Sequence, residues 1–594
     1  MKRLFLYIHT LPYLRWQQIV YRLWYFLKNR ISYLLPLTKL YKTNNYVIPA
    51  NTLKRTRAGI QYYQVFSRFR VKPGMTNRGV LQRTYCSGFS SPFLQVVPCY
   101  HQGAFTFLNL SKSFSGVVDW SFAEYGKLWT YHLNYFDYLN QEKMTGEEGL
   151  ELIRSFLAGM KDKRVGMESY PISLRGMNWI KFLTRWEIHD EAVDALLYRQ
   201  YKHLLSNLEY HILGNHLLEN GFSLLFGACY FGDEQFYRQA EKILREELIE
   251  QILPDGGHFE RSPMYHQIIL SRVLDCINLL SCHSRLSAGK LPGEPESREN
   301  DRPIKLLLLL EETAARMLGW LEQMTFRNGE IPLMNDAAFG MSPATAALAD
   351  YAARIGMFTQ RVPLKDSGYR KIGNDVYEAI LDVGAIGPDY IPGHAHADTL
   401  SFELHVGGMP VIVDSGTSTY EDCPLRHWQR STRAHNTVEI DGHDSSEVWD
   451  SFRVARRAYP RGLKILEAEG IISCAHDGYQ RLSGDPEHSR EWKFRNGGLR
   501  IQDRIAGSFR AAVGRLHFHP DAKLIPSSEA CKEGKIVLLD GRLLYWRLEK
   551  GRGRVIETTW HPEFGLSIPN RCLEIVFTGR EMTVDLAWDR PSDS

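Results

Sequence analysis

The most informative stretch of this chain of 594 residues is Gly393-His394-Ala395-His396-Ala397-Asp398-Thr399-Leu400-Ser401-Phe402-Glu403-Leu404. Two histidines, His394 and His396, stand two residues apart ahead of a segment in which apolar and polar residues alternate. Because residues i and i+2 of an extended strand point to the same face, the two imidazole rings are expected to project side by side.

Two more ligand-type residues follow in similar settings. Asp414 ends the apolar run Pro410-Val411-Ile412-Val413, and His435 precedes the run Asn436-Thr437-Val438-Glu439-Ile440. Imidazole nitrogens and carboxylate oxygens are the ligands of zinc-type sites. The pattern predicts that three strand ends supply such a site, with one histidine left over for chemistry. The alternative is a set of hydrogen-bonded histidines in a β-sheet that holds no metal.

These motifs resemble the C-terminal domain of the heparinase II/III-like polysaccharide lyases, in the alginate lyase and heparinase superfamily. The resemblance is carried by residues 393–398, by Val413-Asp414-Ser415-Gly416-Thr417 and by Arg433-Ala434-His435-Asn436-Thr437. Upstream segments resemble the helical catalytic half of the same family, namely residues 128–135, 178–180, 214–220 and 260–266. The resemblance extends from about residue 115 to the C-terminus.

Length and composition indicate a folded protein with two or more domains, since 44% of the residues are hydrophobic and 24% are charged. The chain contains no uninterrupted apolar stretch of about 18 residues, so no transmembrane helix is predicted. His9 and Arg15 interrupt the apolar N-terminus, and no small-residue cleavage site follows. The nine cysteines are scattered singly, which indicates free thiols. We expect a cytoplasmic or inner-membrane-associated bacterial protein, with a periplasmic location as the alternative.

The charge of the chain is divided unevenly along its length. Seventeen Lys and Arg precede Asp119, the first acidic residue, whereas the remainder is net negative. Residues 13–28 have apolar side chains at helical spacing opposite basic ones, the pattern of a basic amphipathic helix. Since no nucleic-acid module is recognisable, we expect peripheral membrane contact through residues 1–30 and no nucleic-acid partner. The alternative is that this segment docks on the acidic helical domain and buries Trp16 and Trp24.

The hydrophobic period divides the chain into three parts. Residues 1–115 form a basic N-terminal extension with an amphipathic helix, followed by irregular structure. Residues 116–365 have the 3.6-residue period of long helices joined by short loops, which favours antiparallel helix pairs. Residues 366–594 have short alternating segments separated by turn residues, which favours an antiparallel β-sandwich. The expected fold class is α+β multidomain, and the resemblance implies that the helical part is an incomplete (α/α) toroid.

The resemblance further implies a lyase that acts on an acidic polysaccharide containing uronic acid, with β-elimination as the reaction. Such an enzyme must neutralise the substrate carboxylate, take the C5 proton and protonate the leaving glycosidic oxygen. Asn215 is the predicted neutraliser, because its amide donates without adding negative charge, and His216 assists. Tyr265, just after the helix-starting Pro263, is the predicted base and acid. His394 is the predicted second base or neutraliser.

The remaining predicted site residues bind metal or substrate. By the resemblance, His396, Asp414 and His435 hold one structural divalent metal, Zn²⁺ with Ca²⁺ as the alternative. Arginine forks bind carboxylates or sulfates, and tryptophan stacks on sugar faces. The predicted substrate-binding residues are Arg175, Asn178, Trp179, Glu219, Arg261 and Arg433. Each has a structural alternative as an ion-paired residue or a core aromatic.

Two competing hypotheses remain. A glycoside hydrolase on a helical barrel needs two carboxylates that flank the bond, for which Asp255, Glu260 and Asp336 are the candidates. A non-catalytic glycan-binding factor in exopolysaccharide assembly would keep the fold without the chemistry. The presence of Asn215, Tyr265 and His394 argues against the second hypothesis. The sugar, its linkage and the oligomeric state stay open.

Overall fold

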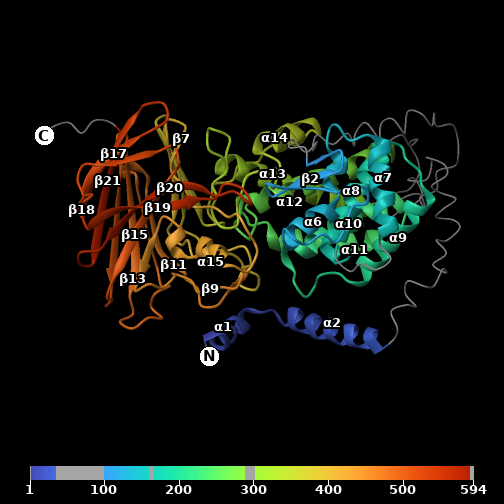
Figure 1. Ribbon diagram of the computed structural model, residues 1–594, viewed down its shortest axis with the longest axis horizontal. Helices are drawn as coiled ribbons and strands as arrows, with labels where there is room; N and C mark the ends of the chain where they lie inside the picture. Colours follow the sequence, from blue (N-terminus) through green and yellow to red (C-terminus); the bar gives the residue numbers. More distant parts are fainter. Residues whose placement is uncertain (1, 35–98, 160–165, 288–300, 589–594) are drawn as a thin grey trace.

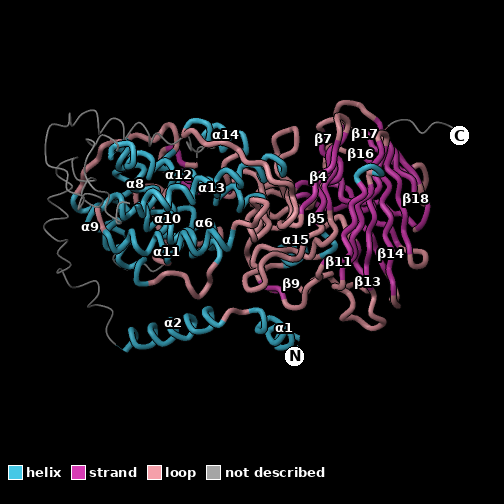
Figure 2. The backbone as a smooth tube through the Cα atoms, turned by 180° about the vertical axis from the view of Figure 1, so that it is seen from behind, coloured by secondary structure: helices cyan, strands magenta, loops and turns pink. Residues whose placement is uncertain are grey.

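The computed structural model describes residues 2–34, 99–159, 166–287 and 301–588. A helical part and a β-sheet part lie next to each other along the long axis of the molecule (Figure 1). The two N-terminal helices run along one side of both parts, as the view from behind also shows (Figure 2). The order of the two parts along the chain is the one expected from the change in hydrophobic period.

The helical part consists of paired helices. They are α6 (Lys127–Tyr135), α7 (Gly146–Gly159), α8 (Ser169–Arg185), α9 (Glu191–Ser206), α10 (Gly214–Phe231), α11 (Glu234–Gln251), α12 (Pro263–Ser287), α13 (Asp301–Met324) and α14 (Thr345–Arg354). Helix α10 packs against α8 and α11, and α12 packs against α13 and α14. The predicted incomplete toroid of antiparallel helix pairs is confirmed.

Local sequence determines where these helices begin and end. The Asp190 and Asp233 side chains accept hydrogen bonds from backbone N–H groups in the first turns of α9 and α11. Gly232, at a positive φ of 69°, ends α10 directly before Asp233. The chain therefore reverses within two residues, which makes α10 and α11 antiparallel neighbours.

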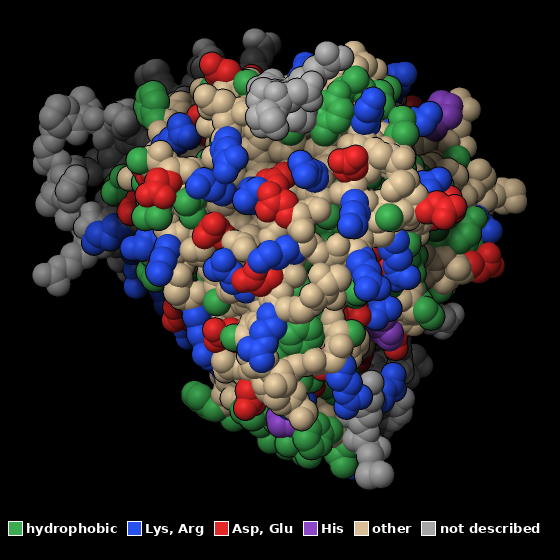
Figure 3. All heavy atoms as spheres, turned by 90° about the vertical axis from the view of Figure 1, so that its left-hand side faces the viewer, with side chains coloured by type: hydrophobic (Ala, Val, Ile, Leu, Met, Phe, Trp, Pro, Cys, Tyr) green, Lys and Arg blue, Asp and Glu red, His purple; other side chains and the backbone are tan. Residues whose placement is uncertain are grey.

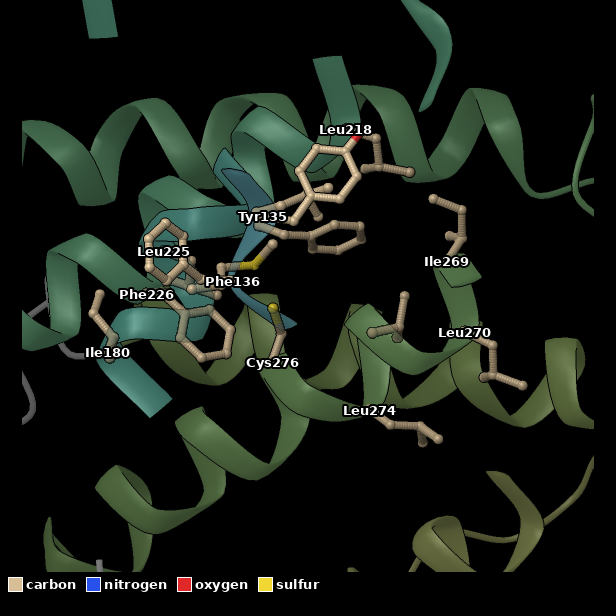
Figure 4. Close-up of a cluster of buried hydrophobic side chains, with 14 of the residues drawn as sticks. Tyr135, Phe136, Ile180, Leu218, Leu225, Phe226, Ile269, Leu270, Leu274 and Cys276 are labelled. Carbon is tan, nitrogen blue, oxygen red and sulfur yellow. The ribbon is translucent and has the colours of Figure 1, made fainter. Parts of the chain in front are cut away.

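Helices α8 and α10 run through the interior of the helical part and are buried on nearly all sides. Figure 4 shows part of this core, where Phe136, Ile180 of α8, Phe226 of α10 and Cys276 of α12 lie close together. All four side chains are at most 1% exposed. Because these helices are surrounded by others, their polar residues face protein instead of solvent.

The β part is an antiparallel sandwich, as predicted. One sheet has the strand order β11 (Pro460–Leu466), β12 (Ile471–His476), β13 (Glu487–Arg495), β14 (Gly498–Ala506), β21 (Glu581–Ala587), β18 (Leu543–Lys550), β17 (Glu533–Val537) and β16 (Lys523–Pro526). The other has the order β19 (Arg552–Trp560), β20 (Ile568–Val576), β15 (Ala512–Phe518), β7 (Met409–Ile412), β6 (Phe402–Val406), β5 (Tyr377–Asp382) and β4 (Tyr369–Gly373), with β8 (Val438–Ile440) paired to β15. Alternate residues of β13 are buried, so one face of that strand packs into the core.

Part of the predicted irregular region is a small sheet. Strands β1 (Tyr100–His101), β2 (Ala104–Phe107) and β3 (Leu110–Ser113) form it, and Phe105 and Phe107 of β2 belong to the helical core. The prediction of irregular structure is wrong here, because strands of two to four residues carry too little alternation to recognise. Residues 35–98, the rest of that prediction, lie outside the described residues.

The N-terminal strap, defined as residues 2–34, comprises α1 (Lys2–Thr10), a short 3₁₀ turn and α2 (Trp16–Leu34). It folds back onto the molecule, with an ion pair from Arg15 to Glu250 and a 2.6 Å hydrogen bond from the Tyr25 hydroxyl to the Leu208 carbonyl. Yet Trp16 and Trp24 are 75% and 57% exposed. The alternative in which docking buries both tryptophans is therefore wrong. Among the described helices, none has the length and apolar character needed to cross a membrane.

Candidate active site

A cavity of about 1260 Å³ lies where the helical part, the loops of the β part and the strap meet. Asn215 and His216 at the start of α10 line it, together with Tyr265 at the start of α12 and His394 from the β part. A backbone hydrogen bond of 3.0 Å from the Asp336 N–H to the His394 carbonyl joins the two parts beside the cavity. The four predicted catalytic residues thus share one cavity.

Tyr265 occupies the helix start that the sequence predicts. Its hydroxyl lies 3.2 Å from the Tyr420 hydroxyl, and its ring stacks on His394 with 3.9 Å between ring centroids. Burial raises the pKa of Tyr265 well above its ordinary value, and the neighbouring Tyr420, Asp336 and Glu260 add to that shift. At neutral pH the phenol is therefore protonated, which is the form that can donate to a leaving oxygen.

His394 is oriented by the buried carboxylate of Asp336. Its Nδ1 lies 2.9 Å from Asp336 Oδ2, and Nη2 of Arg426 donates to the same oxygen at 2.8 Å. Burial alone would raise the pKa of Asp336, but Arg426 and then His394 and His396 hold it well below its ordinary value. An ionised carboxylate only accepts hydrogen bonds, so Nδ1 of His394 carries the proton. Its Nε2 is then free to accept a proton, 3.9 Å from Glu260 Oε2.

Asn215 is held by Glu260. The amide Nδ2 lies 3.0 Å from both carboxylate oxygens of Glu260, which is 2% exposed. Both contacts are donated by Nδ2, which carries two N–H groups. Glu260 thus fixes the Asn215 amide on the cavity wall.

His216 is paired with Glu209 on the loop before α10. Its Nδ1 lies 3.1 Å from Glu209 Oε1, and its ring packs on Tyr170 at 4.6 Å. Burial works to lower the pKa of His216, but Glu209, with smaller contributions from Glu260 and Glu219, raises it above the ordinary value. His216 is thus held closer to its cationic form, which suits neutralisation of a substrate carboxylate.

The predicted substrate-binding residues on α8 are core residues. Arg175 is fully buried and donates to Gln200 Oε1 at 2.8 Å and to the Gly166 carbonyl at 2.8 Å. Trp179 is fully buried against Phe136. Asn178 donates to the Tyr135 carbonyl. None of these three residues lines the cavity, so the structure does not support a substrate contact for them.

The other three predicted substrate-binding residues also lie off the cavity wall. Glu219 is buried and paired with Arg272 at 3.1 Å. Arg261 has a positive φ of 59° and donates to the Ala385 carbonyl. Arg433 lies at the surface with Glu439 at 3.2 Å. Each already has a protein partner, which the sequence could not reveal.

The carboxylates considered for hydrolysis do not flank a common space. Asp255 is buried and accepts hydrogen bonds from the backbone of Lys365 and Ser367. Asp336 is fully buried beneath Arg426. Only Glu260 of the three lines the cavity, so the two-carboxylate geometry of a glycosidase is not formed by this set.

The predicted metal ligands lie together behind His394. His435 Nδ1 is 2.7 Å from Asp414 Oδ2, and the His396 and His435 ring centroids are 5.2 Å apart. Nδ1 of His396 and Nε2 of His435 are buried, and neither has a hydrogen-bond partner among the described residues. Burial lowers the pKa of His396 to about 3, so its ring is neutral, as a metal ligand requires. Within the described ranges no group of three or more ligand side chains has metal-site geometry, and the metal stays a prediction.

The segment around the two histidines is a loop, not the predicted strand. Strand β6 begins only at Phe402. Even so, both rings reach the same carboxylate, because His396 Nε2 lies 2.8 Å from Asp336 Oδ1. The spacing of the two histidines therefore lets both rings contact Asp336. It does not reflect the alternation of side chains along a β-strand.

The sequence did not predict the observed roles of two side chains at the site. Asp336 orients His394 and was considered only as a hydrolase carboxylate. Tyr420 touches Tyr265, yet nothing in its local sequence separates it from the other tyrosines among the 30 in the chain. Asn335, directly before Asp336, has a positive φ of 59°, an unusual backbone conformation next to this carboxylate.

Comparison with known proteins gives matches over both parts of the chain. Residues 170–293 match the heparinase II/III N-terminus, and residues 359–589 match the heparinase II/III-like C-terminal domain. A heparin-sulfate lyase of Bacteroides stercoris is 23% identical over 380 residues, which cover 59% of this chain and 52% of that protein. A heparin-sulfate lyase of Pedobacter heparinus is 26% identical over 272 residues, which cover 42% of this chain and 39% of that protein. The chain spans about half or less of the length of these curated relatives.

Solved structures agree with the fold. A crystal structure of heparinase III has a TM-score of 0.65 at 14% identity, covering 94% of each chain. The heparan sulfate lyase HepC of Pedobacter heparinus has a TM-score of 0.51 at 15% identity, covering 91% of this chain and 88% of that chain. At these identities the likeness establishes the fold of toroid and sandwich. Together with the two domain matches, it shows that this chain belongs to the heparinase II/III-like family.

Proposed function

We propose that this protein is a polysaccharide lyase that cleaves an acidic, uronic-acid-containing polysaccharide by β-elimination. The observation that carries the proposal is the convergence of Asn215, His216, Tyr265 and His394 on one cavity. The names of the curated relatives, both heparin-sulfate lyases, support a glycosaminoglycan as the class of substrate.

Each of the four residues has a role in the proposed reaction. His216 and the amide group of Asn215 neutralise the substrate carboxylate, which makes the C5 proton more acidic. Nε2 of His394 takes that proton as the C5–H bond breaks. A double bond then forms between C4 and C5 while the C4–O bond breaks, and Tyr265 protonates the leaving oxygen. The product carries an unsaturated uronate.

The test is an ultraviolet assay for that new double bond on a panel of heparan sulfate, hyaluronan, chondroitin sulfate and alginate. Tyr265→Phe removes one hydroxyl, and turnover should fall by about 10²–10⁴ while the protein stays folded. Tyr198→Phe is the matched control, since its hydroxyl bonds Asp233 outside the cavity. No absorbing product from any polymer, or full activity in Tyr265→Phe, would contradict the proposal.

We also propose that one divalent cation, Zn²⁺ with Ca²⁺ as the alternative, is held by His396, Asp414 and His435. The buried imidazole nitrogens without partners support it. Such an ion would tie together the loops that position His394. Elemental analysis should find about one ion per chain, which is lost with a lowered melting temperature in His396→Ala/His435→Ala and kept in the control His519→Ala. A wild-type protein without divalent metal would disprove this part.

For the strap, we propose peripheral contact with an anionic membrane. Its outward side chains include Leu4, Ile8, Trp16, Trp24 and Leu27, all more than half exposed. Figure 3, which faces the sandwich end, shows mixed charges there and hydrophobic side chains gathered at the lower edge, where α1 lies in Figure 1. Burying such apolar area gains about 25 cal/mol per Å², and the strap carries basic but no acidic residues.

Liposome co-sedimentation tests the membrane contact. Trp16→Ser/Trp24→Ser should bind anionic vesicles at least about fivefold more weakly than the wild type, and added salt should weaken wild-type binding. Trp186→Ser is the matched control, because that tryptophan is 40% exposed on the helical part. Equal binding by the double variant and the control would rule out the strap as the docking surface.

A further inference from the structure

One arginine on the cavity wall has two donors without a partner. Arg457 is 5% exposed, and its Nη1 donates to Asp389 Oδ1 at 2.9 Å. Tyr13 of the strap covers one face of the guanidinium, with 3.6 Å from Cζ to the ring centroid. The Nε and Nη2 groups are buried and make no hydrogen bond to any residue that the structure describes. The guanidinium is thus held by one edge and one face, and the remaining edge is unused.

The unused edge has the geometry of an anion fork. The Nε–H and Nη2–H groups of an arginine point in parallel, which matches the two oxygens of a carboxylate or sulfate. Arginine stays charged at all physiological pH values, so its two idle donors cannot be made neutral. Buried charged donors without an acceptor are unfavourable, and an anionic group is the partner that satisfies both at once.

Three more arginines line the same cavity, and one of them, Arg272, is paired with Glu219. Arg22 of the strap donates through Nε to the His211 carbonyl at 3.2 Å, and Arg453 has a side chain that is 45% exposed. Burial lowers the pKa of Arg22, and the nearby positive charge of Arg453 lowers it further. Their carboxylate neighbours, Asp389 beside Arg457 and Asp450 beside Arg453, are themselves partly exposed, at 65% and 38%. Arg22, Arg453 and Arg457 thus outnumber these two carboxylates, and Glu209 also lines the cavity.

The segment that carries Arg453 and Arg457 also reaches the catalytic residues. Phe452 lies 6.0 Å from the His394 ring and 5.2 Å from the Tyr420 ring, measured between centroids. A polymer bound at His394 would therefore extend along this segment toward the strap.

We propose that Arg457, supported by Arg453 and Arg22, forms a subsite for the carboxylate or sulfate of a sugar residue beyond the cleaved bond. The assignment rests on the proposed lyase function. Because Tyr13 covers the guanidinium and both donors are buried, the strap or the segment around Arg457 must shift for a sugar to reach the fork. The subsite makes the strap part of substrate recognition.

Binding is measured on full-length Tyr265→Phe protein, so that the polymer is not consumed. Fluorescence anisotropy gives Kd for labelled heparan sulfate, hyaluronan, chondroitin sulfate and alginate, with dextran as the neutral polymer. Arg457→Gln should weaken binding of at least one anionic polymer about tenfold and reduce the salt dependence, and Arg457→Lys should restore only part of the loss. Weakening for hyaluronan or alginate identifies a carboxylate as the ligand, and weakening for heparan sulfate alone identifies a sulfate.

Arg461→Gln is the matched control, because Arg461 pairs with Asp477 and lies off the cavity wall. Its Kd should equal that of the parent. The assignment is overturned if Arg457→Gln binds within twofold of the parent, if the control weakens binding equally, or if the parent binds none of the anionic polymers. The ultraviolet assay on the wild type is independent, so a missing lyase activity and a missing anion subsite are told apart.

Discussion

At the scale of single residues, one buried carboxylate organises the candidate site. Asp336 contacts His394, His396 and Arg426, and the Arg426 guanidinium also lies over the Tyr420 ring at 4.9 Å. The same carboxylate thus orients the proposed base and anchors the cation beneath the second tyrosine. It also explains how His394 presents Nε2 instead of Nδ1 to the cavity.

Replacement of this carboxylate should be costly for stability. Asp336→Asn leaves the fully buried Arg426 without its counter-ion, and the free energy of unfolding should fall by about 3–5 kcal/mol. Urea unfolding measures the difference. The control is Asp350→Asn, which breaks an exposed pair with Arg354 and should change stability by less than about 1 kcal/mol. If the two variants are equally stable, Asp336 does not hold the site together.

At the scale of elements, α8 and α11 show how burial of a helix face determines the hydrogen-bond partners and the pKa of its polar residues. Helix α8 is surrounded by other elements, so the side chains of Arg175 and Asn178 donate their hydrogen bonds to backbone carbonyls of the protein. Helix α11 has one outer face, and its Glu247 lies at the edge of the buried side, 2.7 Å from Gln251 Nε2. Burial raises the pKa of Glu247 to about 7. A carboxyl with a raised pKa favours the folded state only while it is protonated.

The pH dependence of that carboxyl is testable. Its unfolded pKa is about 4.3, so between about pH 4.3 and pH 7 the folded state binds more protons and its stability falls as pH rises. Glu247→Gln removes this loss, because the amide is neutral at every pH. The melting temperature of the variant should exceed that of the wild type at pH 8. This difference in melting temperature should be larger at pH 8 than at pH 4. A constant difference between variant and wild type across this range would contradict the raised pKa.

At the scale of the whole molecule, the helical part and the sandwich have separate hydrophobic cores, and loops of the β part, not its core, reach the cavity. The strap runs along both parts (Figure 1). The strap touches the body through polar groups, among them Arg15 with Glu250 and Gln18 Nε2 with the Ile212 carbonyl at 3.0 Å, and through aromatic rings such as Tyr21, which stacks on Tyr210 at 4.9 Å. A partly exposed ion pair such as Arg15 with Glu250 contributes about 0–1 kcal/mol. The strap should therefore open independently of the cores.

Hydrogen exchange should report this opening. Amides of α2 should exchange much faster than those of the enclosed α10. Glu250→Lys reverses the charge that faces Arg15, and should speed exchange in α2 while the melting temperature stays within about 2 °C. The control is Glu246→Lys, on the exposed face of the same helix. Exchange in α2 as slow as in α10, or unaltered by Glu250→Lys, would mean that the strap is an integral part of the fold.

The sequence by itself determined the succession of a helical and a β-sheet part, because the 3.6-residue and two-residue periods are local properties of the chain. It also placed Tyr265 at a helix start, where Pro263 provides the local signal. These features need no knowledge of what packs against them.

Only the tertiary structure decided which polar side chains face the cavity. Arg175 and Arg457 are both buried arginines, yet the first has acceptors on its helical neighbours while two donors of the second have none. That difference depends on segments far apart in the chain, here the strap and the β part. Asp336 became the partner of His394 in the same way, because a hydrogen bond is satisfied in space and leaves no period in the sequence.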